Sequence, residues 1–171
     1  MALIRPVRGI SPQFDDSCWI ADNATVVGDV VMGRDCTVWF NAVVRGDVNQ
    51  IRLGDCCNVQ DGAVIHCTYQ KTATTIGNYV SIAHNAIVHG CTIEDRVLIG
   101  MGAIVMDGAV IGIGSIIAAG AIVTQNTIVP PGSIYAGNPA RLLKAVSPEQ
   151  AEVFMRTANN YVMYAGWYRN Q

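Results

Sequence analysis

The sequence has few of the features that mark a membrane, secreted or nucleic-acid-binding protein. Its apolar runs are interrupted by Gly, Asp or Asn well short of the roughly 18–20 residues that a membrane-spanning helix requires, and its first residues lack the apolar segment of a signal peptide. The 11 basic and 13 acidic residues give a formal net charge of -2, which provides no basic surface for nucleic acid. We therefore expect a cytoplasmic protein that binds neither membranes nor nucleic acid.

Disulfide cross-links are not expected either. A chain of 171 residues, 51% of them hydrophobic, can bury a sizeable core as one compact unit without them. The cysteines show no framework spacing, so we expect most of them to be reduced core residues. They are Cys18, Cys36, Cys56, Cys57, Cys67 and Cys91.

The strongest pattern in the sequence is a period of six residues. From Ile93 onward an aliphatic residue occupies every sixth position until Tyr135, and a small or short side chain follows each one by four positions. This pattern is typical of a parallel β-helix built from hexapeptides, in which the aliphatic side chain fills the interior and three hexads make one triangular coil. The aliphatic series is Ile93, Ile99, Val105, Ile111, Ile117, Val123 and Val129.

The same period continues upstream from Ile20 to Val88, with three breaks. We expect bulges or loops at "RGDVNQIR" and "CTYQKTATT", whereas "HGCT" is one residue short. The pattern predicts about eighteen hexads, or six coils, over residues 20–140, with residues 1–19 as a lead-in. A β-sandwich of short strands is the alternative, but it would not keep a six-residue phase through the end of the array.

A C-terminal helix is predicted over residues 147–168. Ser147 as N-cap, Pro148 at the first helical position and Gln150 form a capping-box pattern. Apolar residues recur at spacings of three and four, so one face should pack on the solenoid or on a neighbouring subunit. They are Ala151, Phe154, Ala158, Tyr161 and Ala165.

The chain has only 3 histidines, and the repeat relates all of them. His66 and His89 each follow an interior aliphatic residue by one, three hexads apart, so their strands should be neighbours about 4.8 Å apart. Zn–N bonds of about 2.0–2.1 Å allow both to bind one metal ion. His84 lies on the preceding face, so it could reach that metal only from another copy of the chain in a closed ring. The alternative is that each histidine is a hydrogen-bonded surface side chain.

Other polar residues fall in the same columns. Arg45 should lie one coil below His66, and Asp61 one coil below His84, with Gln60 beside Asp61. Arg45 and Asp47 are either surface charges or an ion pair that fixes a subunit interface, with Asp47 or Asp61 as the carboxylate partner.

Several segments together resemble the γ-class carbonic anhydrases and their close bacterial relatives over essentially the whole chain: "VVRGDV", "NVQDGAVIH", "SIAHNAIVHGCTI" and "TANNYVMYAGWY". The resemblance implies a left-handed parallel β-helix, an all-β solenoid, that assembles as a homotrimer. It also implies a divalent metal, Zn²⁺ or in some members Fe²⁺ or Co²⁺, bound by His66 and His89 of one subunit and His84 of the next.

By the same resemblance, a metal-bound hydroxide would hydrate CO₂ to bicarbonate. Gln60 would contact the metal-bound solvent, and Tyr161 would reach the site from the C-terminal helix. The interface network would contain Arg45, Asp47 and Asp61, with Asn58 as a further member.

The chain departs from the strongly active archaeal members at two places. They have a glutamate soon after the "R-x-D" segment and another in the loop after the first metal histidine, whereas this chain has Val48 and "CTYQKTATT". Proton export would then depend on water or buffer, and we expect activity to be weak. The alternatives are a hexapeptide acyltransferase, a metal-dependent thioesterase and a non-catalytic trimeric scaffold. Cys67, next to His66, is expected to be a buried structural thiol.

Overall fold

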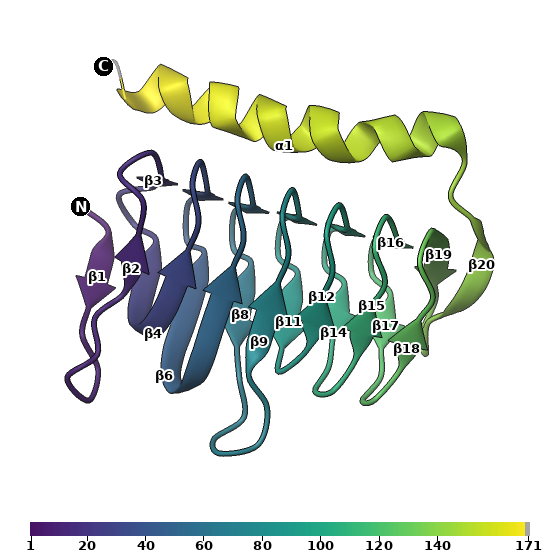
Figure 1. Cartoon of the computed structure of the whole chain (residues 1–171), viewed down its shortest axis with the longest axis horizontal. Helices are drawn as coiled ribbons and strands as arrows, with labels where there is room; N and C mark the ends of the chain where they lie inside the picture. The colour runs from purple at the N-terminus through teal and green to yellow at the C-terminus, as the bar shows by residue number, and fades with distance from the viewer. Residues whose placement is uncertain (170–171) are drawn as a thin grey trace.

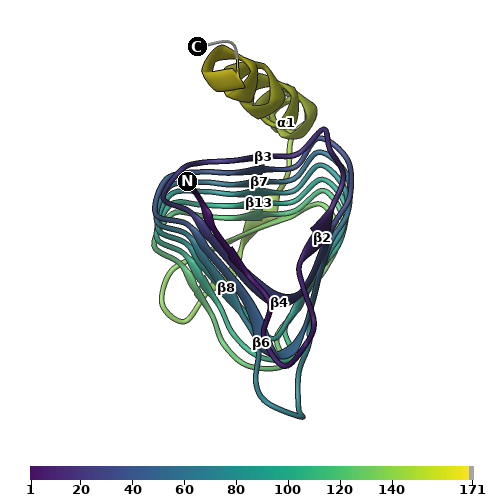
Figure 2. The ribbon, with the colours of Figure 1, turned by 90° about the vertical axis from the view of Figure 1, so that its left-hand side faces the viewer.

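The computed structural model describes residues 1–169 and consists of a left-handed parallel β-solenoid of about 7 turns followed by one long helix (Figure 1). Viewed along its axis, the solenoid is a triangular prism (Figure 2). The predicted hexapeptide β-helix is therefore confirmed.

The first face of the prism is an 8-stranded sheet in which one short strand from each coil pairs in parallel with the next, and a final strand pairs antiparallel. In spatial order it contains β3 (Trp19–Ile20), β5 (Thr37–Val38), β7 (Asn58–Val59), β10 (Ser81–Ile82), β13 (Leu98–Ile99), β16 (Ile116–Ile117), β19 (Ser133–Ala136) and β20 (Arg141–Ala145).

The other two faces form one 12-stranded sheet, because β4 (Thr25–Met32) and β6 (Val43–Leu53) run around the corner between them. The face that we call the β8 face also contains β1 (Leu3–Arg5), β8 (Val64–His66), β11 (Ile87–His89), β14 (Ile104–Val105) and β17 (Ile122–Val123). The third face adds β2 (Gln13–Phe14), β9 (Thr74–Ile76), β12 (Thr92–Ile93), β15 (Val110–Ile111) and β18 (Ile128–Val129).

The core is the column of aliphatic side chains inside the prism. Every member of the six-residue series from Val26 to Val129 is buried. All 6 cysteines are free thiols, as expected, and most of them belong to this core. Burial of so many aliphatic groups, each favourable by about 1.5–3 kcal/mol, explains why the chain folds without cross-links.

The solenoid begins earlier than residue 20. Within residues 1–19, which we expected to be a lead-in, β1 pairs with β4 from Leu3 to Arg5, and β2 pairs with the second part of β4. The count of six coils is therefore too low by about one turn. The six-residue period extends back only to Phe14; Ile4, which pairs with the interior Val26, precedes Phe14 by ten residues, so the count of sixes breaks within this turn.

The three breaks in the repeat have different structures. "RGDVNQIR" is neither a loop nor a simple bulge, because it belongs to the continuous strand β6, which bends around the corner. "CTYQKTATT" contains the loop between β8 and β9, which projects from the prism (Figure 1). "HGCT" shortens one corner by a residue, and Gly90 there has a positive φ of 56°.

The helix α1 (Pro148–Arg169) packs on the first face of its own solenoid (Figure 2). The capping box is present, because Ser147 Oγ accepts from the Gln150 backbone N–H at 3.3 Å and the Ser147 backbone N–H donates to Gln150 Oε1 at 3.1 Å. Phe154, Ala158 and Ala165 are buried, as the periodicity predicted, whereas Ala151 is exposed. Within residues 1–169 no helix has the length and apolarity needed to cross a membrane.

The corner around which β4 and β6 both bend leads to a prediction about stability. Gly28 has a φ of 76°, and a Cβ at this position would overlap the carbonyl oxygen of Gly46 on the next coil. Gly120 has a φ of 67° but open space around it. We expect Gly120→Ala to lower the free energy of unfolding by about 1–2 kcal/mol, the cost of a left-handed backbone alone. Gly28→Ala should cost clearly more, because backbone atoms must also move.

Urea denaturation of the two variants at one protein concentration measures this difference. Equal destabilisation would mean that the close approach of Gly28 and Gly46 does not constrain the corner.

Candidate metal centre

Two clusters of polar side chains lie at the two edges of the β8 face. The first, which we call the two-histidine corner, lies at the C-terminal ends of β8 and β11 and contains His66 and His89. The second, the His84 corner, precedes the same face and follows β10. Both clusters arise at corners of the prism, where His66 and His89 end their strands and His84 lies in the turn after β10.

The two histidines of the first cluster are direct neighbours. His66 and His89 are paired in the register of β8 and β11, as the six-residue period predicted. His66 Nδ1 and His89 Nε2 face each other at 3.2 Å. A tetrahedral metal with Zn–N bonds of about 2.0–2.1 Å holds two ligand nitrogens roughly 3.3 Å apart, so this pair has the spacing of two ligands of one ion.

Arg45 and Asp47 complete the side of the cluster below His66. Arg45 NH1 donates to Asp47 Oδ2 at 2.6 Å, and His66 Nε2 lies 3.1 Å from Asp47 Oδ1. Arg45 NH2 also lies 3.4 Å from His66 Nδ1. The predicted ion pair of Arg45 is therefore made with Asp47 of the same chain rather than with Asp61.

The electrostatics of this corner favour a neutral imidazole. Burial lowers the pKa of His66, the positive charge of Arg45 acts in the same direction, and together they outweigh the opposing effect of Asp47. Burial acts to raise the pKa of Asp47, but hydrogen bonds from Arg45 and His66 bring it below its ordinary value. A neutral imidazole beside an ionised carboxylate is the form that a metal ligand requires.

Asp107 is a residue of this corner that the sequence reasoning missed. Its Oδ1 lies 2.8 Å from His89 Nδ1, on the opposite side of the ring from His66. Burial acts to raise the pKa of Asp107, but hydrogen bonds from His89, Thr68 and Thr72 lower it overall. The only sequence signal was the short corner at "HGCT", which moves Asp107 of the next coil over Gly90 and next to His89.

The His84 corner is a second, more exposed cluster. His84 Nδ1 lies 3.0 Å from Asp61 Oδ2, with Asp61 one coil below as predicted. Gln60 is buried beside them, and its Nε2 donates to Asn58 Oδ1 at 2.8 Å; Asn58 in turn donates to Ser81 Oγ at 2.8 Å. Among residues 1–169, no hydrogen bond is made to Gln60 Oε1.

Tyr161 comes to the His84 corner from α1 of the same chain. Its ring packs against Trp39 with centroids 5.2 Å apart. Burial raises its pKa to about 12, and the negative charge of Asp61 adds to the shift. The phenol therefore stays protonated at neutral pH and can donate a hydrogen bond.

One chain brings together two of the three histidines but not the third. Across the part of the chain that the structure describes, no three His, Cys, Asp or Glu side chains are grouped closely enough to hold a metal ion. His84 lies at the other edge of the β8 face, on the preceding corner. The residues fit a metal that has two ligands on one corner and takes its third from elsewhere.

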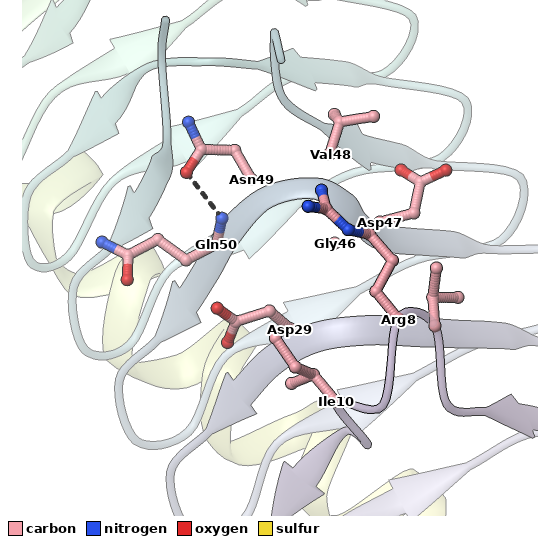
Figure 3. Close-up of a pocket in the computed structure, with 9 residues that line it drawn as sticks. Arg8, Ile10, Asp29, Gly46, Asp47, Val48, Asn49 and Gln50 are labelled. Carbon is pink, nitrogen blue, oxygen red and sulfur yellow. Dashed lines mark hydrogen bonds between the residues drawn. The ribbon is translucent and has the colours of Figure 1, made fainter. Parts of the chain in front are cut away.

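A cavity of about 300 Å³ opens next to the two-histidine corner (Figure 3). Asp47 and Val48 line it, and Arg8 extends across it beside Asp47. Solvent entering this cavity reaches Asp47, which contacts His66. Cys67 lies elsewhere in the interior, where burial raises the pKa of its thiol, in agreement with a structural role.

Comparisons with known proteins agree with this architecture. Residues 13–46 and 90–125 match the family described as bacterial transferase hexapeptide (six repeats). The chain is 52% identical over 143 residues to a probable carbonic anhydrase of Methanocaldococcus jannaschii, covering 84% of this chain and 89% of that one. It is 40% identical to mitochondrial gamma carbonic anhydrase 1 of Arabidopsis thaliana, covering 88% of this chain and 57% of that one. The crystal structure of a hexapeptide transferase family protein of Anaplasma phagocytophilum is 38% identical, with a TM-score of 0.93 over 97% of this chain and 98% of that one.

The opposing charges of Arg45 and Asp47 predict that removing one or the other shifts the pKa of His66 in opposite directions. Arg45→Gln removes a cation and should raise the pKa of His66, whereas Asp47→Asn removes a carboxylate partner and should lower it. NMR titration of the His66 ring in metal-free protein measures both shifts. Asp61→Asn, at the other corner, is the control and should leave the His66 titration unchanged. Shifts of the same sign in both corner variants would contradict this account of the electrostatics.

Proposed function

Because this chain belongs to the family of γ-class carbonic anhydrases and their hexapeptide-repeat relatives, we propose that it catalyses the reversible hydration of CO₂ to bicarbonate. The catalyst is a homotrimer with a divalent metal, Zn²⁺ in the first instance and Fe²⁺ or Co²⁺ as alternatives, at each subunit interface. His66 and His89 of one copy and His84 of the next hold the metal.

The position of the two clusters on the β8 face carries this proposal. They occupy opposite edges of one face, and His84 and His89 belong to the same coil, so they lie at the same height along the solenoid. If three copies are arranged around a threefold axis parallel to the solenoid, with their β8 faces turned toward the axis, His84 of one copy stays at the same height as His89 of the next. The two-histidine corner of each copy then meets the His84 corner of the next, in a heterologous contact that closes into a ring.

The outer surface of the β8 face supports such a ring. Its outward column is apolar, and paired strands align its members directly above one another. Ile87 at its centre is 37% exposed in the single chain. The equivalent column on the third face is mixed, since Arg52, Thr75 and Thr92 precede Val110 and Ile128. The apolar column consists of Val43, Val64, Ile87, Ile104 and Ile122.

The chemistry divides between the metal and the chain. When bound, a divalent metal with neutral nitrogen ligands supplies the Lewis acidity that lowers the pKa of water to about 7. Gln60 Oε1, free to accept a hydrogen bond, orients the attacking water molecule, and Asn58 fixes the Gln60 amide from behind. Tyr161 supplies a neutral phenol donor at the same corner.

Two carboxylates bind one ring nitrogen of a histidine ligand each, so that the other ring nitrogen is available to the metal. Asp47, held by Arg45, accepts a hydrogen bond from the N–H at Nε2 of His66, and Asp61 accepts one from the N–H at Nδ1 of His84. Val48, which cannot transfer a proton, lines the cavity beside Asp47. Proton export then depends on buffer molecules, so turnover should be slow at low buffer concentration and increase with it.

The main competing function is acyl transfer, to which the hexapeptide transferase structure points. The His84–Asp61 pair, 3.0 Å apart, has the form of a general base with its orienting carboxylate. Such a base would need neither His66 nor His89. Substitution of His89 therefore separates the two functions.

Subunit mixing tests the proposed site most directly. Neither His84→Ala nor His89→Ala should retain metal or hydrate CO₂, with rates at least about 100-fold below wild type. Co-expressed in equal amounts, the two variants should recover metal and activity in about one quarter of the interfaces, where an intact two-histidine corner meets an intact His84.

Stopped-flow CO₂ hydration with metal analysis, on Zn²⁺-loaded and anaerobic Fe²⁺-loaded protein, gives the readout. Mixed trimers without metal or activity would mean that the interfacial site is wrong. Activity of His89→Ala toward an acyl donor would favour acyl transfer.

The apolar column predicts the oligomeric state. Ile87→Lys places a charge at the centre of the β8 face and should convert trimers to monomers without unfolding the solenoid, because the Ile87 side chain points outward. Thr92→Lys introduces the same side chain at an exposed position of the third face and should leave the trimer intact. Sedimentation velocity distinguishes the species. A monomeric wild-type protein, or a trimer disrupted by Thr92→Lys, would contradict the assignment of the interface.

A further inference from the structure

We infer that Asp107 is a positioning residue that fixes the orientation and tautomer of His89 and ties the β8–β9 loop to this ring. The inference deepens the proposed function, and it depends on that function only in treating His89 as a metal ligand. Asp107 lies in the turn between β14 and β15, one coil beyond His89.

The hydrogen bonds around Asp107 define which nitrogen of His89 is available. The ionised carboxylate can only accept hydrogen bonds, so the contact of 2.8 Å requires the proton of a neutral His89 to lie on Nδ1. Nε2 then carries a lone pair, and it is the atom that faces His66 at 3.2 Å. Asp107 thus directs the lone pair of His89 toward the position between the two rings.

The same carboxylate holds both ends of the projecting loop. Thr72 Oγ1 donates to Oδ1 and Thr68 Oγ1 to Oδ2, each at 2.9 Å. An antiparallel bridge between these two threonines closes the loop, whose tip contains Lys71. The Asp107 carboxylate therefore fixes both the position of the loop and the orientation of the His89 ring.

Gly90 makes this arrangement possible. A Cβ at Gly90 would overlap both Asp107 Oδ1 and Thr72 Oγ1. The short corner at Gly90 gives the carboxylate and the threonine the space beside the ring that a side chain would otherwise fill.

The repeat itself provides a matched comparison. Asp95 occupies the same hexad position as Asp107, two residues after an interior aliphatic residue, and its carboxylate likewise covers a glycine of the previous coil, Gly77. It accepts from the backbone N–H of Asn78 at 2.8 Å and contacts no histidine. Asp95 thus covers a glycine of the previous coil as Asp107 does, but it does not contact a histidine.

The test compares Asp107→Leu, Asp107→Asn, Asp95→Leu and the double variant Thr68→Val/Thr72→Val with wild type. Three measurements are made on each: the ¹⁵N shifts of the His89 ring in metal-free protein, Zn²⁺ affinity by competition with a chromophoric chelator, and the rate of tryptic cleavage after Lys71. The first and third need no metal.

We expect wild-type His89 to be protonated on Nδ1. Asp107→Leu should abolish this preference, weaken Zn²⁺ binding about 10–100-fold, and accelerate cleavage after Lys71 about tenfold or more. Asp107→Asn keeps an acceptor oxygen and should restore much of the tautomer preference. The double threonine variant should accelerate cleavage while preserving the tautomer. Asp95→Leu should change none of the three by more than about threefold.

Three results would overturn the inference: an Nε2-protonated His89 in wild type, Zn²⁺ affinity of Asp107→Leu within about threefold of wild type, or equal effects of Asp107→Leu and Asp95→Leu. If Asp107→Leu does not fold, the asparagine and threonine variants decide the question through the tautomer and cleavage measurements. A wild-type protein that binds no Zn²⁺ or Fe²⁺ refutes the proposed function, whereas the tautomer and the cleavage rate still test Asp107.

Discussion

Parallel backbone hydrogen bonding at constant register is the constraint on which the rest of this structure depends. Each short strand pairs with the strand three hexads later, so residues at one hexad position form a column along the prism. Aliphatic columns fill the interior, and polar columns form at the corners. A functional residue is therefore placed by its phase in the repeat as much as by its immediate neighbours.

The position of each residue within the six-residue repeat explains how much of the protein could be predicted from sequence. The hexapeptide solenoid, the pairing of His66 with His89 and the position of Asp61 below His84 follow from counting in sixes, and all are present. The C-terminal helix follows from its capping box. The first turn was missed because ten residues rather than six separate Ile4 from Phe14, and the continuity of β6 was missed because the period is interrupted there.

Asp107 was missed for a related reason. It does not share the hexad position of His66 and His89, and it reaches His89 because the corner at Gly90 is one residue short. Counting detects the missing residue, but the contact depends on how the two turns overlap in space. Likewise, sequence allowed Arg45 to pair with either Asp47 or Asp61, and only the three-dimensional path of β6 selects Asp47.

The helix α1 changes how such an array can unfold. A helix of 22 residues is about 33 Å long, close to the roughly 30 Å spanned by seven strands about 4.8 Å apart. It starts near the last coil and ends at the first, where Tyr168 packs on Trp19 and Arg169 donates to the Ser17 carbonyl (Figure 1). A linear repeat array can fray from either end, because each coil contacts only its neighbours. Here one segment connects the two ends, so the loss of either terminal coil also removes the packing of α1, and the two ends of the solenoid are coupled.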